Sequence, residues 1–403
     1  MPVSFYLTRE VELAVQEETS YGTSPGAVVG ADMFKHTSRL HITPKRERIY
    51  RDKDADYQQA SILAPAQKGR ESSDVKIQTD VVPSGNAATI TEPDVDVLLK
   101  AHFGTKHKAT AHTTTAAGSS GTNLKLATGG VAASGVQAGD LIAVDVDAVN
   151  GYEVRRVVAL VGGGTPDDLT LDRAFTVDPA ASRTVKLGTT YRFLNTATLS
   201  VYLWQWIAGT GARHAVPGLI ISGLEASCSM DAGTPKPTFS FSGRGMKEVT
   251  HVTARPTPTT AGQALVPTQA KAWVGAAKLC AVQSSFRSNN GLELRENTCV
   301  LDPAGVKRTG NDSRYSVEAT IETMLTTGDV DTAALYESAK SSDASPLSVL
   351  IQWGIVPGTM VAWAAPKFVA DPERSEIKGE FGVRLSGKCL GTSGDDELFL
   401  AFI

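Results

Sequence analysis

The stretches Leu199-Ser200-Val201-Tyr202-Leu203-Trp204-Gln205-Trp206 and Leu347-Ser348-Val349-Leu350-Ile351-Gln352-Trp353 begin with the same three residues and continue as apolar, strand-forming sequence. Each stretch follows a helical segment that an Asp-Val-Asp triplet introduces, at 94–96 and at 329–331. Each helical segment in turn follows an alternating, strand-like segment, at 74–79 and at 316–322. Internal repeats define the building block of a fold. The repeat therefore predicts two equivalent units of strand, helix and strand.

Size and composition set the outer limits of the fold. A chain of 403 residues exceeds what one hydrophobic core usually serves, so we expect two or three domains. Hydrophobic residues at 41% and charged residues at 20% are typical of a folded globular protein. The net charge of -4 argues against a protein that grips nucleic acid through a basic face. An acidic lining past which nucleic acid slides remains compatible with it.

The chain shows no sign of disulfides, zinc binding, secretion or membrane insertion. Its cysteines, Cys228, Cys280, Cys299 and Cys389, form no C-x-x-C pair, which favours buried free thiols. Charged residues soon after the start prevent an apolar signal-peptide core, and no apolar run approaches the ~20 residues of a membrane helix. We expect a protein kept in the cytoplasm, or one exported without a signal sequence.

Most of the chain has the pattern of antiparallel strands, with few helices. Alternation is clear at 238–243 and 378–385, and Asn290-Gly291 predicts a hairpin turn. The best helix is predicted from Glu92 to Phe103, with Thr91 as its N-cap. A second helix is predicted over 332–339.

The two copies differ in length between the helix and the Leu-Ser-Val strand. The second copy has only the loop 340–346 there, whereas the first holds a Thr/Ala/Gly/Ser-rich stretch followed by dense strand patterns. We interpret this as a small β-barrel or sandwich inserted into a surface loop, where closure entropy costs little. The expected domains are a first unit at 1–104 and 196–252, an inserted β domain at 105–195, a Pro/Thr-rich linker at 253–269 and a second unit at 270–403.

No sequence pattern carries catalytic or metal-binding chemistry. The glycine-rich segment 162–168 lacks the ending of a phosphate-binding loop and is typical of a hairpin. The carboxylates in 145–153 are spaced too irregularly for a calcium loop, and Asn150-Gly151 favours a solvated turn. Neither a Gly-x-Ser-x-Gly elbow nor a His-Glu-x-x-His motif occurs. We expect no enzyme activity, no cofactor and no bound metal.

A run of mixed charge near residue 50 has two interpretations. It is either a solvated loop or an arm that contacts another subunit. The residues of the contact hypothesis are Lys45, Arg46, Arg48, Arg51, Asp52, Lys53 and Asp54. A pair of tryptophans, Trp204 and Trp206, shares one face of a strand, where sheet packing is favoured over a platform for sugars.

The segment Glu18-Thr19-Ser20-Tyr21-Gly22-Thr23, directly after a short strand-like stretch, resembles the opening of tail tube proteins from long-tailed bacteriophages. The helix after the strand at 75–77 is similar too, as is the run from 218–221 into a Pro-then-Phe-rich strand and Ser-Gly-Arg-Gly at 242–245. These motifs are short, and their order along nearly the whole chain outside the insert carries the resemblance. The chain resembles the major tail tube protein of a siphovirus-type phage in its fused, two-unit form.

The resemblance implies tandem β-sandwich units whose sheets join edge to edge, six units closing a ring around a DNA-conducting lumen. Rings would then stack into a tube. Because this chain carries two units, three chains should supply the six positions, with the insert decorating the outside in threefold symmetry. Ring closure also pairs the backbone N–H and C=O groups that an open sheet leaves unpaired.

The resemblance further implies a structural protein of the virion tail, made in the host cytoplasm. Its partners would be other copies of itself, a tape-measure protein, tail terminator or baseplate proteins, and viral DNA bound without sequence specificity. A competing hypothesis is a carbohydrate- or receptor-binding protein of the virion, with the insert as the binding module and the two tryptophans as stacking surfaces.

Deletion of residues 45–70 is expected to leave single rings that do not polymerise, because the contact arm would no longer reach the adjacent ring. Negative-stain images of the purified variant measure this as tube length. A tube length equal to that of the intact chain would contradict the assignment of the arm.

Overall fold

The protein folds as layered strands with few helices. The computed structural model describes residues 11–37, 42–49, 67–83, 85–161, 166–194, 199–207, 213–229, 236–259, 264–265, 270–294, 306–308, 315–325, 332–340, 345–392 and 394–403. Within these ranges strands dominate and three α-helices occur. The prediction of a mainly β fold with flanking helices is confirmed.

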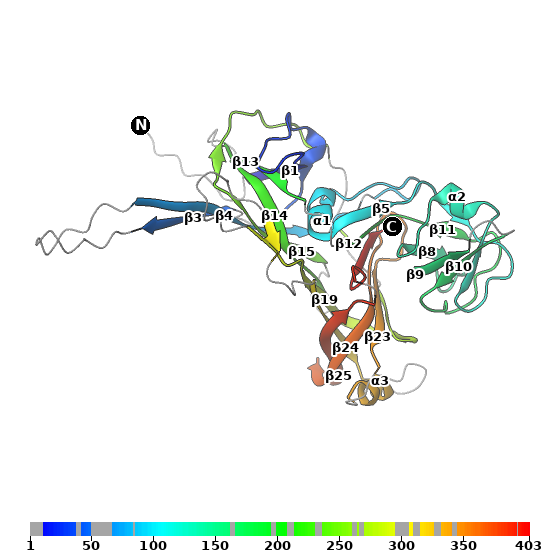
Figure 1. Ribbon diagram of the computed structural model, residues 1–403. Helices are drawn as coiled ribbons and strands as arrows, with labels where there is room; N and C mark the ends of the chain where they lie inside the picture. The colour runs from blue at the N-terminus through cyan, green and yellow to red at the C-terminus, as the bar shows by residue number, and fades with distance from the viewer. Residues whose placement is uncertain are drawn as a thin grey trace, which may run out of the picture.

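One continuous antiparallel sheet runs through both halves of the chain (Figure 1). Its strands, in spatial order, are β3 (Ile42–Ile49), β4 (Gln67–Asp80), β15 (Thr238–Met246), β14 (Arg213–Ser229), β19 (Ala281–Asn289), β22 (Ser316–Met324), β25 (Glu380–Leu390) and β24 (Val361–Ile377). The first four come from the N-terminal half and the last four from the C-terminal half. We call this the main sheet.

A second layer of strands packs on one face of the main sheet in each half. In the first half it comprises β1 (Val11–Glu17), β2 (Met33–Phe34), β13 (Val201–Ile207) and β16 (Val249–Thr250). In the second half it comprises β17 (Ala270–Val274), β18 (Ala277–Leu279), β23 (Leu347–Trp353), β26 (Phe399–Phe402), β12 (Thr189–Phe193) and β5 (Gly104–Lys108). The long strands β14 and β24 pair into both layers.

A single hydrophobic core lies between the layers and extends across both halves. Alternate residues of the main sheet point into it, among them Ile77, Leu224, Phe286 and Ile321. Because successive strand residues face opposite sides, the other residues of the same strands form a polar, exposed face.

One helix packs on the core in each half. The helix α1 (Asp96–Phe103) buries Leu98, Leu99 and Phe103 and ends at Gly104, whose φ of 88° suits a residue without a Cβ. It begins four residues later than predicted. The side chain of Thr91 caps nothing, and the Asp94 carboxylate accepts the backbone N–H of Lys35 instead. The helix α3 (Thr332–Lys340) lies close to its predicted range.

The insert forms a separate small barrel with its own core. Its sheet runs in the order β6 (Thr113–Thr114), β11 (Thr184–Lys186), β8 (Leu141–Asp145), β9 (Tyr152–Val161), β10 (Asp167–Leu171) and β7 (Asn123–Leu126). A bridge between Thr115 and Leu126 brings the two ends of this sheet together. The short helix α2 (Gly130–Ser134) packs beside β6.

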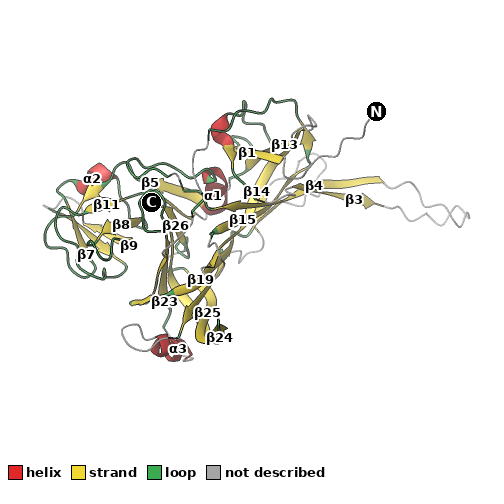
Figure 2. Cartoon of the chain, turned by 180° about the vertical axis from the view of Figure 1, so that it is seen from behind, coloured by secondary structure: helices red, strands yellow, loops and turns green. Residues whose placement is uncertain are grey.

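The insert interrupts the first half but docks on the second half (Figure 2). Leu141, Ala143 and Val154 of the insert form one apolar cluster with residues of the second layer, including Leu350 and Ala362. The Gln352 side chain bridges the two parts, because its Oε1 accepts the N–H of Val154 at 3.0 Å and its Nε2 donates to the Tyr152 carbonyl at 3.2 Å. The insert therefore covers apolar surface that the second half would otherwise expose to water.

A buried ion pair lies in this contact. The Arg155 guanidinium donates to Glu153 at 2.7 Å and lies between the rings of Phe175 and Trp273, 4.8 and 4.5 Å from their centroids. Burial lowers the pKa of Arg155 to about 10, which leaves the group charged at neutral pH. Burial alone would raise the pKa of Glu153, but the charge of Arg155 and hydrogen bonds from Thr176 hold it below its usual value.

Replacement of Arg155 by methionine should destabilise the chain by about 1–3 kcal/mol, because the buried Glu153 would keep only the more distant Lys278, 3.7 Å away, as its ion-pair partner. Urea unfolding and limited proteolysis of the insert measure the loss. The double variant E153Q/R155M should recover most of it, because no uncompensated charge then remains. A loss equal in the single and double variants would show that packing, and not the charge pair, sustains the contact.

Candidate assembly interfaces

The two halves are joined by a ladder between β14 and β19. Seven residue pairs, from Gly223–Asn289 to Ser229–Gln283, lie opposite one another in this ladder. β14 holds β15 on its other edge, so it is a fully paired strand here. The main sheet therefore crosses from one half to the other without a break.

Buried polar groups fix the end of this junction. The imidazole Nε2 of His102 in α1 lies 2.8 Å from the Ser288 hydroxyl. The Asn290 side chain donates to the carbonyls of His102 and Ile221, at 3.1 and 2.7 Å. Beside them Phe193 stacks on Tyr315, with centroids 4.0 Å apart. The hairpin turn predicted at Asn290-Gly291 does not form among the described residues, because the next strand, β20 (Leu292–Leu294), pairs with β21 (Val306–Arg308) and not with β19. The Asn290 amide is instead buried and satisfies carbonyls of the first half.

The main sheet ends in two strands that are paired on one edge only, among the described residues. β3 pairs with β4 alone. β24 pairs with both β23 and β25 at Phe368, but from Val369 to Ile377 its only ladder partner within the described ranges is β25. Each of these strands contains a proline, Pro44 and Pro372, which is typical of an edge strand.

The charged run of the contact hypothesis begins on one of these edge strands. β3 and β4 form a hairpin that projects from the side of the molecule opposite the insert (Figures 1 and 2). Lys45 pairs with Asp74, which also accepts the Arg244 guanidinium at 2.8 Å. Arg46 and Arg48 lie in β3, opposite Glu71 and Lys68. Arg51, Asp52, Lys53 and Asp54 lie outside the described residues.

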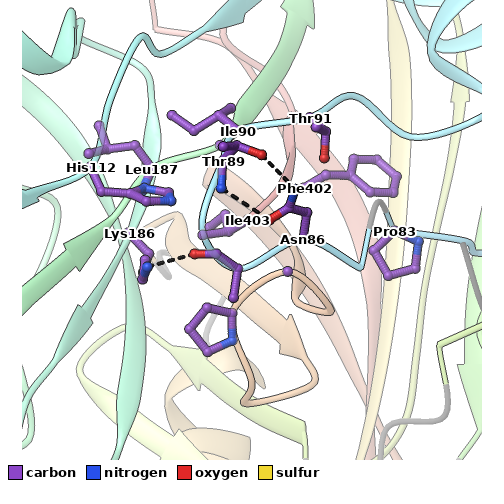
Figure 3. A pocket seen from close by; sticks show the side chains of 14 residues that line it. Pro83, Asn86, Thr89, Ile90, Thr91, His112, Lys186, Leu187, Phe402 and Ile403 are labelled. Carbon is purple, nitrogen blue, oxygen red and sulfur yellow. Dashed lines mark hydrogen bonds between the residues drawn. The ribbon is translucent and has the colours of Figure 1, made fainter.

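One groove lies at the root of the β3–β4 hairpin and another hollow lies beside the insert, and both are smaller than a typical ligand site. A groove of about 170 Å³ at the root of the hairpin is lined by Lys45, Glu71, His214, Lys247 and Glu248 among others. A second hollow lies where the loop 83–91, the insert and the end of the second half meet (Figure 3). There Lys186 donates to the Ala87 carbonyl at 2.7 Å. The volume of this second hollow, about 10 Å³, is barely enough for one water molecule.

The tryptophans of the competing hypothesis are buried. Trp204 and Trp206 are 3% and 4% exposed, and their indole N–H groups donate to Gln16 and to the Thr253 carbonyl. They pack with Tyr202 and Met33 under the loop that precedes β2. They therefore offer no surface on which a sugar could stack.

Among the described residues, no three His, Cys, Asp or Glu side chains lie together as metal ligands would. Cys228 and Cys389 are buried free thiols, and burial raises the pKa of each to about 12. None of the helices in the described ranges combines the length and apolarity needed to cross a bilayer.

A comparison of the sequence with protein families agrees with the layered β fold. The family model for phage tail tube proteins matches residues 8–383 of the chain. The chain belongs to the phage tail tube protein family. The match spans both halves and the insert of this tail tube protein. No curated protein matches the chain. Family membership places the protein in the virion tail in a structural role, as the resemblance implied.

The junction of this tail tube protein should weaken in acid. Burial lowers the pKa of His102 to about 3, whereas the unfolded chain keeps a pKa near 6.5. The folded chain therefore loses stability as the pH falls from 6.5 towards 3, by about 1.4 kcal/mol per pH unit from this group. Urea unfolding at stepped pH, compared with H102Q, isolates this contribution as a difference in slope. Equal slopes would mean that His102 takes up a proton without cost.

Proposed function

We propose that three copies of this tail tube protein close a ring of six units, and that such rings stack into a tube through which the phage DNA passes. The proposal includes a duplicated unit, one copy in each half. The expected domain boundaries at 104, 196, 253 and 270 belong to the same proposal. The open edges of the main sheet are the contacts that would join the copies.

The two halves share a local detail that supports the duplication. In both halves a meander of three long strands follows the Leu-Ser-Val stretch, as β13, β14 and β15 and as β23, β24 and β25. In both, the third strand carries Ser-Gly opposite the second. A Cβ at Gly243 would lie 2.1 Å from the Ile220 carbonyl oxygen, and one at Gly387 would lie 1.9 Å from the Val369 carbonyl oxygen. In both meanders the third strand thus needs a glycine where it closely approaches a carbonyl of the second strand.

The observation that carries the proposal is that one edge is filled in the first unit and open in the second. β13 leaves β14 at Leu219, and β19 takes over from Gly223 on the edge opposite β15. β23 leaves β24 at Phe368, and no described strand takes over on the edge opposite β25. By analogy with the internal junction, the open edge of β24 lacks a strand in the place that β19 occupies beside β14.

The strand that fits this open edge is β3 of the next copy. In the second unit β19 is followed by its partner β22, and in the first unit β3 is followed by its partner β4. β3 thus occupies in the first unit the place that β19 occupies in the second. A head-to-tail contact of this kind closes a ring if its rotation does. Three chains would supply three internal junctions and three junctions between chains.

The prolines of the two edges restrict wrong pairing and leave this pairing available. Proline cannot donate a hydrogen bond, so Pro44 and Pro372 direct their nitrogen away from β4 and β25 and towards the open edge. Each removes one outward donor. Each edge therefore presents an interrupted row of donors, which weakens its pairing with any partner strand.

The side chains of the projecting hairpin are assigned to the contact between rings, whereas the backbone edge of β3 serves the ring itself. Because residues 45–49 belong to β3, deletion of 45–70 should weaken the ring as well as the stacking of rings. Lys45, Arg46, Arg48, Arg51, Asp52, Lys53 and Asp54 are its proposed contact residues. Ion pairs at its root, between Lys45 and Asp74 and between Lys247 and Glu71, hold β3 and β4 to the turn after β15. Assembly in the host cytoplasm and contacts with tape-measure, terminator or baseplate proteins belong to the same proposal.

A proline in place of Glu376 tests the ring contact. Alternate residues of a strand direct their N–H groups to the same edge, so the N–H of Glu376 faces the open edge, as the nitrogen of Pro372 does. The variant E376P should keep the ladder with β25 and reduce the assembled fraction roughly tenfold, because one bond per junction is lost and the proline ring meets the neighbouring strand. Negative-stain microscopy and sedimentation measure assembly.

The matched control is E376Q, which removes the same charge but keeps the N–H group. It should assemble as the native chain does. Circular dichroism and the thermal midpoint of unassembled E376P should stay close to native values, which separates a loss of assembly from a loss of fold. Normal rings from a well-folded E376P, or compact monomers from the native chain, would contradict the proposed ring.

A further inference from the structure

The polar face of the main sheet extends over seven strands, from β4 to β24. Among the described residues, the helices α1 and α3 and the second-layer strands that bury the core lie on the opposite face. Glu225 and Glu318 are exposed on the polar face, whereas their strand neighbours Leu224 and Val317 are buried. The face continues across the junction of β14 and β19 without interruption.

In two rows of this face, cross-strand neighbours alternate in charge. One row reads Gln78, Ser240, Glu225, Arg287, Glu318, Lys388 and Val369, each opposite the next on adjacent strands. A second row reads Ser229, Gln283, Glu322, Arg384 and Glu373. Residues directly opposite in antiparallel strands lie within contact distance of each other. Every base in these rows therefore has an acid on at least one side.

Between the two charged rows lies a row of small hydroxyl residues. It reads Asp80, Thr238, Ser227, Ser285, Thr320, Ser386 and Asp371. The hydroxyls of Ser227 and Thr238 lie 3.3 Å apart, as do those of Thr320 and Ser386. Five neighbouring strands thus contribute a hydroxyl and no large side chain to this part of the face.

We propose that this face is the wall of the lumen, and that double-stranded DNA moves over it without being held. The inference rests on the proposed tube. Hydroxyls and amides contact phosphates without a net charge, whereas unpaired lysines and arginines bind them through release of counterions. The acids beside Arg287 and Lys388 cancel that attraction. The bases beside Glu225 and Glu318 likewise prevent a strongly repulsive wall.

The variant E225Q/E318Q tests the charge balance. It leaves Arg287 and Lys388 without the acids of their row, so assembled tubes should retain a short fluorescent DNA duplex at low salt at least tenfold more tightly than native tubes, about what two added phosphate contacts give. High salt should abolish the gain. The matched control is E17Q/E337Q, which makes the same change in net charge away from the polar face, on β1 and α3. Equal retention by the two variants, or no gain in E225Q/E318Q tubes, would overturn the proposal.

A cysteine pair tests which face lines the lumen and does not depend on DNA binding. In a background with Cys280 and Cys299 replaced by serine, S285C lies on the polar face and S338C lies exposed on α3. A bulky maleimide should modify both in the unassembled chain but only S338C in tubes. If tubes form and S285C still reacts as fast as S338C, the lumen assignment fails while the tube stands. If native chains form no tubes, the proposed function fails first.

Discussion

The ladder between β14 and β19 is the interaction on which the rest of the structure depends. Each half presents an incomplete edge, and this ladder completes one edge of each. The bonds of one further strand pair are modest in net free energy, but leaving such groups buried and unpaired is costly. The polar contacts of His102, Ser288 and Asn290 therefore specify where the two halves meet, and the shared core supplies the stability.

Each half has an apolar outer face that must be covered from water, and the two halves cover it in different ways. In the first half, the outer face of β1 and β13 lies under the loop before β2, with Trp204 and Trp206 packed beneath it. In the second half, the outer face of β23 and β26 lies under the insert. Exposed apolar patches of this kind favour aggregation. The insert therefore has a structural role in the second half, in addition to anything that its own surface contacts.

The sequence predicted the features that depend on local pattern and missed those that depend on distant partners. Alternation identified strands such as 238–243, and the range of α3 followed from its polar start. The start of α1 was placed too early because Asp94 binds the backbone of Lys35, a contact between residues far apart in the chain. The burial of the Asn290 amide could not be predicted either, because its partners His102 and Ile221 are distant in sequence and Asn-Gly is by itself a turn signal.

The docking of the insert had no local signal either. In the sequence, Leu141 and Val154 have the pattern of core residues of a small barrel. In the structure, the register of β8 and β9 directs both side chains out of the barrel and onto Leu350. The edges were different, because the resemblance to tail tube proteins implied units whose sheets join edge to edge. Strand order is encoded along the chain, whereas the surface on which a folded insert comes to lie is not.

Covalent linkage of two units has a consequence for assembly, if the ring is as proposed. A junction inside one chain forms at a high effective concentration, whereas a junction between chains depends on the concentration of free copies. Half of the junctions of a three-chain ring would therefore form during folding. The ladders between β3 and β24 of neighbouring copies would then be sensitive to mass action. The proline in each of these strands weakens premature pairing of the open edges.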